Sequence, residues 1–244
     1  MPLPPVPPHR PRPRRWRPLR GLECVLLGDG AVGKTSLALS YSTNGFPARY
    51  VPTALDRFSG TVAAAPPREG RYPRPAPAVV QVDGAPIRLQ LCDTAGQDEF
   101  DALWQTCCPK ADVCLLCFSV VAPTSFRNIA DKWYPEVRRN CPSARVLLVG
   151  TQSDLRQDVK VLIALSRRQE KPVPPAAACS LARKLGLAGY VECSALTQEN
   201  LKEVFDTAIV LGLQAGEGAR GQRRPPSCIW ALSKDWWSKY VCVR

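Results

Sequence analysis

The feature that most constrains this chain is the segment Gly28–Thr35, which reads GDGAVGKT. It follows an apolar, strand-like run and opens a helix-like run, which is the context that a phosphate-binding loop (P-loop) requires. Glycines let the backbone curl so that successive N–H groups and the helix N-terminus point at a phosphate. Lys34 is then placed to bridge two phosphate oxygens, and Thr35 to offer its hydroxyl to Mg²⁺. A glycine turn that only joined a strand to a helix would not need this lysine and threonine, so we predict a nucleotide site.

A second segment indicates which base is bound. Thr151–Asp154 comes directly after the apolar run Leu147–Gly150. A carboxylate at Asp154 can accept hydrogen bonds from both N1–H and N2–H of guanine, whereas adenine has an acceptor at N1 and no amine at C2. Asp154 therefore predicts guanine selection. The alternative for this residue alone is an aspartate that caps a helix after a strand.

Asp93–Gln97 (DTAGQ) ends a further apolar run and supplies the remaining parts of a hydrolytic site. Asp93 is placed to hold Mg²⁺ through water, Gly96 to give its N–H to the γ-phosphate, and Gln97 to orient the attacking water. Thr53 is predicted to be the switch threonine, whose hydroxyl reaches Mg²⁺ only while the γ-phosphate is present. The alternative for Thr53 is a solvated loop threonine.

The rest of the chain alternates strand-like and helix-like runs, which predicts an α/β fold with a mostly parallel, six-stranded sheet and helices on both faces. The expected strands are Glu23–Gly28, Phe58–Val62, Pro86–Cys92, Val113–Val120, Arg145–Gly150 and Tyr190–Cys193. The expected helices are Lys34–Tyr41, Ser125–Arg139, Ala176–Leu185 and Leu201–Leu213.

Most of the formal net charge of +12 lies in the tails. Residues 1–20 carry a net +6, residues 215–244 a net +4 and residues 63–80 a net +2, so the remaining body is neutral. A nucleic-acid-binding domain places its excess charge on a folded face, so we expect no nucleic-acid partner. No apolar run approaches the roughly 20 residues that span a bilayer, and the start lacks a hydrophobic signal core, so we expect synthesis in the cytosol.

The 11 cysteines have no regular spacing, which predicts reduced thiols rather than a disulfide scaffold. Cys114 and Cys117 form a C-x-x-C, but they lie inside an apolar run, and His9 is the only histidine. We expect them to be buried structural thiols rather than zinc ligands.

Taken together, GDGAVGKT, PTALDRFS, DTAGQDEFD, CFSVVAPTSF, KWYPEV, LLVGTQSDLR and VECSALTQENLKEVFD resemble the Rho family of small GTPases over residues 22–213. KVLIALSRRQEKPVP, the proline-rich N-terminus and the tail LSKDWWSKYVCVR are most similar to the atypical RhoU/RhoV branch, closer to RhoU. The resemblance implies a Ras-like P-loop GTPase domain over residues 21–214, with GTP/GDP and Mg²⁺ as cofactors. It also implies a Rho-type helical insert at about residues 158–171.

The resemblance completes the expected site. Ser194–Leu196 is similar to the second guanine-contacting loop of the family. The implied catalytic residues are Gln97, Lys34 and Thr53, and the implied metal ligands are Thr35, Thr53 and Asp93. The implied effector-binding residues are Thr53, Ala54, Leu55, Asp56 and Phe58. The implied nucleotide-binding residues are Gly28, Asp29, Gly30, Ala31, Val32, Gly33, Lys34, Thr35, Ser36, Phe46, Tyr50, Thr53, Asp93, Thr94, Ala95, Gly96, Gln97, Thr151, Gln152, Ser153, Asp154, Leu155, Ser194, Ala195 and Leu196.

Both tails carry candidate attachment motifs. Pro5, Pro8 and Arg10 form P-x-x-P-x-R in the disordered or polyproline segment 1–20, which suits an SH3 groove; the alternative is a merely disordered tail. The basic segment 215–244 lacks a C-a-a-X box. Cys242 takes the place of the branch's palmitoylated cysteine, although Arg244 replaces the usual apolar last residue. We expect peripheral attachment to the cytoplasmic face of the plasma membrane and endomembranes, with part of the protein cytosolic.

The chain departs from the family pattern in two places. Residues 63–80 form a proline-rich excess between the two switch segments, which cannot be a central strand. Without it, Phe58–Val62 and Val82–Cys92 would form a hairpin around the turn Asp83–Gly84. Two explanations stay open: a looped-out bulge, or intronic sequence retained in the predicted gene. Trp104 and Cys108 stand where the family commonly has arginine and tyrosine, so regulators of this surface are expected to bind differently.

The expected function is a GTPase switch that works with exchange factors, GTPase-activating proteins and effectors of the p21-activated kinase type. The resemblance implies control of actin, adhesion and cell shape. The alternative is an adaptor that exchanges nucleotide fast, hydrolyses poorly and recruits SH3 proteins. A P-loop kinase that uses adenine nucleotides is disfavoured by Asp154 and by the lack of a substrate-binding lid.

Overall fold

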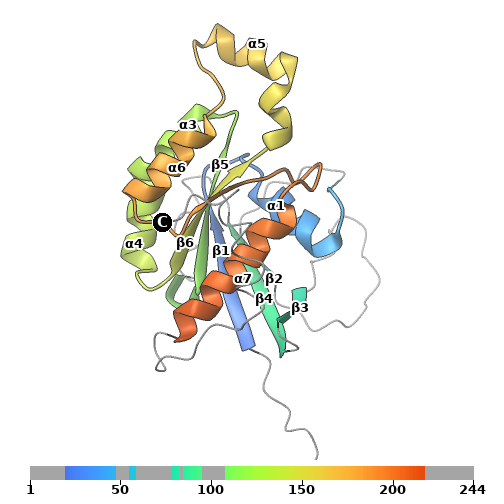
Figure 1. Cartoon of the computed structure of the whole chain (residues 1–244), viewed down its shortest axis with the longest axis vertical. Coiled ribbons are helices and arrows are strands. Elements are labelled where there is room, and N and C mark those ends of the chain that lie inside the picture. The colour runs from blue at the N-terminus through green and yellow to red at the C-terminus, as the bar shows by residue number, and fades with distance from the viewer. Residues whose placement is uncertain (1–19, 48–54, 59–77, 83–84, 95–107, 218–244) are drawn as a thin grey trace, which may run out of the picture.

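The computed structural model describes residues 20–47, 55–58, 78–82, 85–94 and 108–217 (Figure 1). Its strands are β1 (Arg20–Leu27), β2 (Leu55–Phe58), β3 (Ala78–Val82), β4 (Ala85–Thr94), β5 (Val113–Ser119), β6 (Arg145–Thr151) and β7 (Tyr190–Glu192). Its helices are α1 (Lys34–Thr43), η2 (Cys108–Lys110), α3 (Pro123–Asn128), η3 (Ile129–Trp133), α4 (Tyr134–Asn140), η4 (Ser153–Gln157), α5 (Val159–Arg167), α6 (Pro175–Lys184) and α7 (Leu201–Glu217).

The strands form one sheet in the order β2-β4-β1-β5-β6-β7, with β3 also paired to β4. β1, β4, β5, β6 and β7 run parallel, and β2 and β3 are antiparallel to β4. β5, with the sequence VCLLCFS, is buried at every position. A strand that is apolar on both sides must be covered on both faces. The predicted α/β class with a mostly parallel sheet is confirmed.

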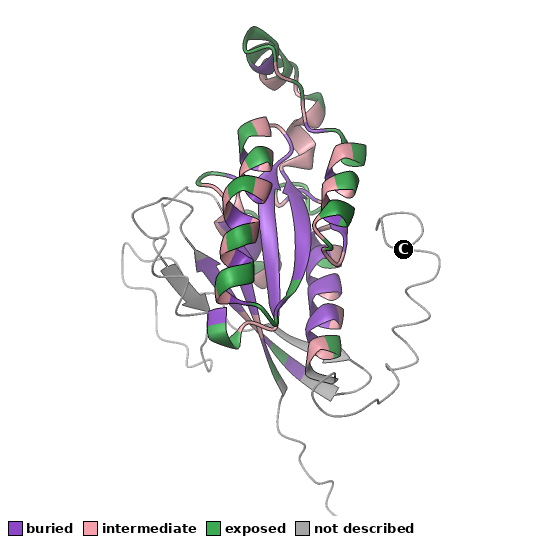
Figure 2. Cartoon of the chain, turned by 90° about the vertical axis from the view of Figure 1, so that its left-hand side faces the viewer, coloured by how far each residue is buried: buried purple, intermediate pink, exposed green. Residues whose placement is uncertain are grey.

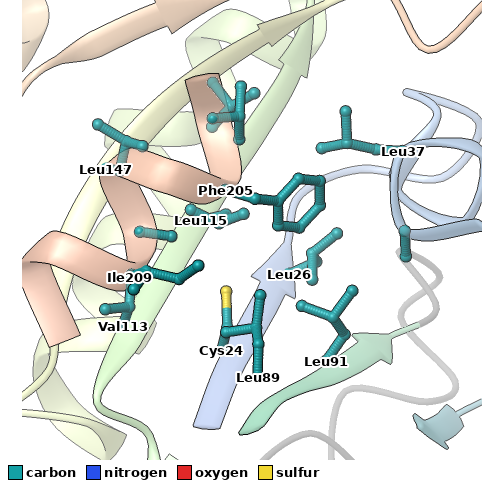
Figure 3. Close-up of a cluster of buried hydrophobic side chains, with 14 of the residues drawn as sticks. Cys24, Leu26, Leu37, Leu89, Leu91, Val113, Leu115, Leu147, Phe205 and Ile209 are labelled. Carbon is teal, nitrogen blue, oxygen red and sulfur yellow. The ribbon is translucent and has the colours of Figure 1, made fainter. Parts of the chain in front are cut away.

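Each face of the sheet carries its own core (Figure 2). On one face, α1 and α7 cover Leu26 and Leu115 (Figure 3). On this face the ring of Phe205 also stacks on that of Tyr41, with 3.9 Å between the ring centroids. On the other face, the core includes Phe118 of β5 and Trp133 of η3 together with residues of α4 and α6. Because α7 is amphipathic at helical spacing, it buries Val204, Phe205, Ala208 and Ile209 in the first core.

The edge strand differs from the prediction. In the described part of the sheet we find seven strands, because β2 and β3 pair with successive parts of β4. The described residues that form a hairpin with β4 are Ala78–Val82, whereas Phe58 pairs with Leu91 of β4 as the last residue of β2. Residues 59–62 of the expected hairpin strand lie outside the described ranges. The last three residues of the predicted excess segment therefore belong to the sheet. Alternation of small and branched residues in AVVQV suits an edge strand once the prolines have ended.

The predicted helix Ser125–Arg139 consists of three pieces. α3 passes into a π-helical turn, η3, and then into α4. Pro135 explains the break, because a proline has no N–H and its ring clashes with the carbonyl four residues earlier. A π turn is one way for a helix to absorb that conflict.

The cysteine prediction is partly wrong. Cys108 and Cys141 form a disulfide, with Cα atoms 5.0 Å apart, since η2 packs against the end of α4. This pairing joins residues 33 positions apart, which the spacing of the cysteines did not reveal. The interpretation of Cys114 and Cys117 as buried free thiols is confirmed. They lie in the two different cores, on opposite faces of β5, and burial raises the pKa of each to about 12.

The expected helical insert is α5, which projects from the body at the top of Figure 1. Asp158 caps it by accepting a hydrogen bond from the Val161 N–H at 3.0 Å. No helix within the described ranges has the length and apolar character needed to cross a bilayer.

Candidate functional site

The described parts of the predicted P-loop, Asp93 and Thr151–Asp154 segments gather at one edge of the sheet, where the parallel strands have their carboxyl ends. Gly28–Gly33 leaves β1, Asp93 lies near the end of β4, and Thr151–Asp154 leaves β6. The strand register pairs Leu26 with Asp93 and Gly150 with Glu192, so the strands end at similar levels. Open α/β sheets bind their ligands at this edge.

The P-loop turns closely against β5. Gly28 has φ +145°, and a Cβ at this position would lie 2.0 Å from the backbone oxygen of Cys117. Gly33 has φ +96° and precedes α1 as its N-cap residue. Only glycine adopts these conformations at no cost, so the backbone geometry explains why positions 28 and 33 of the motif are glycines.

Lys34 begins α1 and is 5% exposed. Its Nζ donates hydrogen bonds to the backbone oxygens of Gly28 at 2.8 Å and Asp29 at 2.7 Å. Burial lowers the pKa of Lys34, while the nearby Asp93, Cys117 and Asp29 oppose this shift. The lysine charge is therefore held inside the curl of the loop, beside the N-terminus of α1.

The end of β6 braces the P-loop. The Thr151 hydroxyl lies 2.6 Å from the Val32 backbone oxygen and 2.9 Å from that of Phe118. Gln152 accepts a hydrogen bond from the Ser119 hydroxyl at 2.6 Å and donates to the Ala31 backbone oxygen at 3.3 Å. The side chains of these two predicted nucleotide-binding residues thus contact the loop itself.

The two predicted base-reading segments meet. The Ser194 hydroxyl donates to Asp154 Oδ1 at 2.5 Å, and the Thr197 backbone N–H donates to the same hydroxyl oxygen at 3.1 Å. These two hydrogen bonds in series orient one carboxylate oxygen of Asp154. Two apolar side chains of the predicted site are exposed, Phe46 at 47% and Leu196 at 54%, and are available to contact a flat base.

A bidentate ion pair holds η4, the element that carries Asp154. Arg156 Nε and Nη2 donate to the two carboxylate oxygens of Glu192, each at 2.7 Å. Arg156 also donates to the Val173 backbone oxygen at 2.9 Å, and the Tyr190 hydroxyl donates to Glu192 at 2.7 Å. Burial, and then the neighbouring Glu192, raise the pKa of Tyr190. The network ties η4 to β7.

We expect Arg156→Ala to lower the free energy of unfolding by about 3 kcal/mol, because it leaves a partly buried carboxylate without its bidentate partner. Chemical denaturation measures this loss. The matched control is Arg139→Ala, whose side chain is 71% exposed and pairs with Glu136 at 2.8 Å. That variant is expected to lose no more than about 0.5 kcal/mol. Equal losses in the two variants would contradict the role given to Arg156.

Three contacting residues are absent from the sequence-based site. Ser119 orients Gln152, while Asn128 and Trp133 donate hydrogen bonds to the carboxylate of Asp29. Ser119 is a polar residue at the carboxyl end of a buried strand, and this position could have identified it as a site residue from the sequence. A tryptophan on the buried face of a helix also needs an acceptor for its N–H, but the sequence does not say which acceptor lies nearby.

Several predicted residues lie outside the described part of the chain. These are Tyr50, Thr53, Ala54, Ala95, Gly96, Gln97, Trp104, the SH3-ligand residues Pro5, Pro8 and Arg10, and Cys242. Leu55, Asp56 and Phe58 lie in β2 and Thr94 ends β4.

The site combines a glycine loop that carries a lysine at a helix N-terminus with an oriented carboxylate that follows the second strand along in the sheet. These features define a P-loop nucleotide-binding protein of the guanine-specific class. The Ras family model matches residues 23–69 and 75–212. The chain is 51% identical to the Rho-related GTP-binding protein RhoV of Mus musculus and to that of Homo sapiens, over 227 residues in each case. These matches cover 92% of this chain and 88% of each relative.

The chain belongs to the Ras family, as a Rho-related GTP-binding protein, and is a GTPase that uses GTP/GDP and Mg²⁺. The similarity supports the predicted RhoU/RhoV branch. The preference for RhoU within that branch stays a prediction.

The described residues fit Mg²⁺. Asp93 is fully buried at the ligand edge, and Thr35 lies in the first turn of α1 beside Lys34. A carboxylate and a hydroxyl are the hard oxygen donors that Mg²⁺ prefers, and nucleotide phosphates supply further oxygens. Within the described ranges we find no group of three or more His, Cys, Asp or Glu that could hold a metal, which this kind of site does not need.

Proposed function

We propose that this chain is a Rho-type molecular switch whose guanine nucleotide lies across the P-loop, Asp93, Asp154 and Ser194. The observation that carries the proposal is the convergence of Lys34 with the Asp154–Ser194 pair at one sheet edge. A phosphate-binding lysine and a guanine-reading carboxylate at the same edge fit the two ends of one nucleotide.

In the proposed site, Lys34 and the N–H groups at the start of α1 bind the phosphates. Thr35, Asp93 and the switch residue Thr53 would hold Mg²⁺, which supplies charge neutralisation on the phosphate oxygens. Gly96 would donate its N–H to the γ-phosphate, and Gln97 would orient the attacking water. Thr53 and Gly96 then respond to the γ-phosphate, and effectors read their arrangement.

A second candidate is the GTP-loaded adaptor. The observation that favours it is the P-x-x-P-x-R motif at Pro5, Pro8 and Arg10. In this proposal the tail recruits SH3 proteins, while the GTP-bound domain recruits effectors of the p21-activated kinase type. Both candidates share the nucleotide site, and both lead to signalling on actin, adhesion and cell shape.

One experiment tests the shared site and separates the two candidates. Nucleotide released from the purified full chain is identified by chromatography, and phosphate release is followed in a single turnover after GTP loading. We expect guanine nucleotide in both cases. The switch predicts phosphate release that an activating protein's arginine speeds by about 10³ to 10⁵. The adaptor predicts almost no release, and bound ATP or ADP would overturn both.

We also propose that the C-terminal segment attaches the protein to membranes through acylated Cys242. One acyl chain needs a second signal, and the neighbouring Trp236, Trp237, Lys234 and Lys239 would provide an interfacial and basic one. Cys242→Ser is expected to move the protein into the soluble fraction of fractionated cells. Unchanged membrane retention would refute this anchor.

A further inference from the structure

The carboxylate of Asp29 contacts the helical layer beside the P-loop. Asn128 Nδ2 donates to Asp29 Oδ2 at 2.7 Å, and Trp133 Nε1 donates to Asp29 Oδ1 at 2.7 Å. The two donors are 99 and 104 residues away along the chain. Each oxygen of one P-loop carboxylate therefore has its own donor from the α3–η3 layer.

The helix is shaped so that both donors reach this carboxylate. Asn128 is the last residue of α3, and Trp133 is the last residue of the π turn η3. A π turn changes the direction of the side chains that follow it, and such turns are frequent at functional sites. The Trp133 ring is fully buried in the second core, so its indole N–H has little freedom to turn elsewhere.

Asp29 also contacts the phosphate-binding lysine, through its backbone. The backbone oxygen of Asp29 accepts a hydrogen bond from Lys34 Nζ at 2.7 Å, while its side chain bonds to the helical layer. A carboxylate near a phosphate is unfavourable, because like charges repel strongly at short range. Two donors that hold the Asp29 carboxylate on the α3–η3 side keep this charge directed away from the phosphate-binding face of the loop.

We propose that Asn128 and Trp133 are positioning residues that clamp Asp29, hold the P-loop in its phosphate-binding shape and slow the release of nucleotide. The inference rests on the proposed phosphate-binding role of the P-loop. It adds to that role a contact with the helical layer that sets how long the nucleotide stays.

The test uses Trp133→Phe in the full chain, which keeps an aromatic ring in the core and removes the N–H donor. The matched control is Tyr134→Phe, which removes the hydrogen bond from the Tyr134 hydroxyl to the Leu185 backbone oxygen at 2.7 Å. That bond leaves the next residue of the same helix toward α6 and not toward the P-loop. Each variant loses one partly buried hydrogen bond; Tyr134→Phe also loses an exposed one from Arg138 Nε at 3.2 Å, and Trp133→Phe also removes buried ring volume. Melting temperatures are therefore measured only to show that both variants are folded. A merely structural role predicts similar nucleotide release from the two folded variants.

The measured quantity is the rate at which fluorescent GDP dissociates in excess unlabelled GDP and Mg²⁺. We expect about tenfold faster release from Trp133→Phe, equivalent to about 1.4 kcal/mol, because a hydrogen bond to a charged group is lost. Tyr134→Phe is expected to release GDP at the wild-type rate. Equal release rates in wild type and Trp133→Phe would overturn the clamp.

A double-variant cycle provides the second measurement. Asp29→Ala removes the acceptor, so adding Trp133→Phe to it is expected to change the release rate little further. Effects that multiply fully would show that the two residues act independently and would overturn the clamp. A wild-type chain that retains no guanine nucleotide would instead overturn the proposed function itself. Retained nucleotide with unchanged release in the variants leaves the proposed function standing and removes only the clamp.

Discussion

Asp154→Ala is expected to weaken binding of GDP and GTP by about a hundredfold or more. The carboxylate would accept N1–H and N2–H of guanine, and each hydrogen bond to a charged group contributes about 1.5–3 kcal/mol. Every 1.4 kcal/mol is about a factor of ten in affinity. Adenine offers neither donor, so the variant's preference for guanine over adenine should fall by a similar factor. Competition of GDP and ADP against fluorescent GDP measures both quantities.

Asp158→Ala is the matched control for this variant. It removes a second carboxylate four residues further on, whose Oδ1 accepts the Val161 N–H at 3.0 Å and caps α5. Loss of such a cap costs about 1 kcal/mol of local stability and leaves the base-reading pair unchanged. An Asp154→Ala protein that still prefers guanine as strongly as wild type would remove the basis for the proposed function.

Gly28→Ala is expected to lower the free energy of unfolding by more than about 4 kcal/mol and to abolish nucleotide binding. The added Cβ would lie 2.0 Å from the Cys117 backbone oxygen, and the φ of +145° is itself strained for alanine. No rotamer change relieves this clash, because the backbone fixes the position of a Cβ and the Cys117 oxygen belongs to the backbone of β5. Thermal denaturation and the yield of folded protein measure the loss of stability.

Two further glycines serve as controls. Gly186 has φ +64°, and no atom lies within 4 Å of the place that an added Cβ would take, so its alanine variant should lose only about 1 kcal/mol from backbone strain. Gly21 has neither a positive φ nor an atom within 4 Å of that place, so its alanine variant should be close to neutral. A Gly28→Ala protein as stable as Gly186→Ala would show that the P-loop can move away from β5.

The fold and much of the site could be predicted because their signals are local. The run VCLLCFS is apolar at nearly every position, which indicates a strand buried on both faces, and β5 is buried throughout. The motif at Gly28–Thr35 specifies both a backbone shape and a lysine. Asp154 and Ser194 were predicted to act on one base, and the structure brings them into direct hydrogen bonding.

Other features depend on contacts between distant segments. The pairing of Ala78–Val82 with β4 required the chain to return to the same sheet edge after a proline-rich segment. The disulfide between Cys108 and Cys141 and the hydrogen bonds from Asn128 and Trp133 to Asp29 also join residues far apart in sequence. Periodicity and spacing carry no information about such pairs.

The amino-acid sequence by itself determined the α/β class, the phosphate-binding loop and the expectation of guanine, because each follows from residue types at fixed short spacing. The tertiary structure alone decided what holds those parts in place. Thr151, Gln152 and Trp133 reach the P-loop from other elements, and Arg156 ties the base-reading turn to β7. The physical reason is that a hydrogen bond depends on where two groups lie in space, and only the packed sheet and helices bring these groups together.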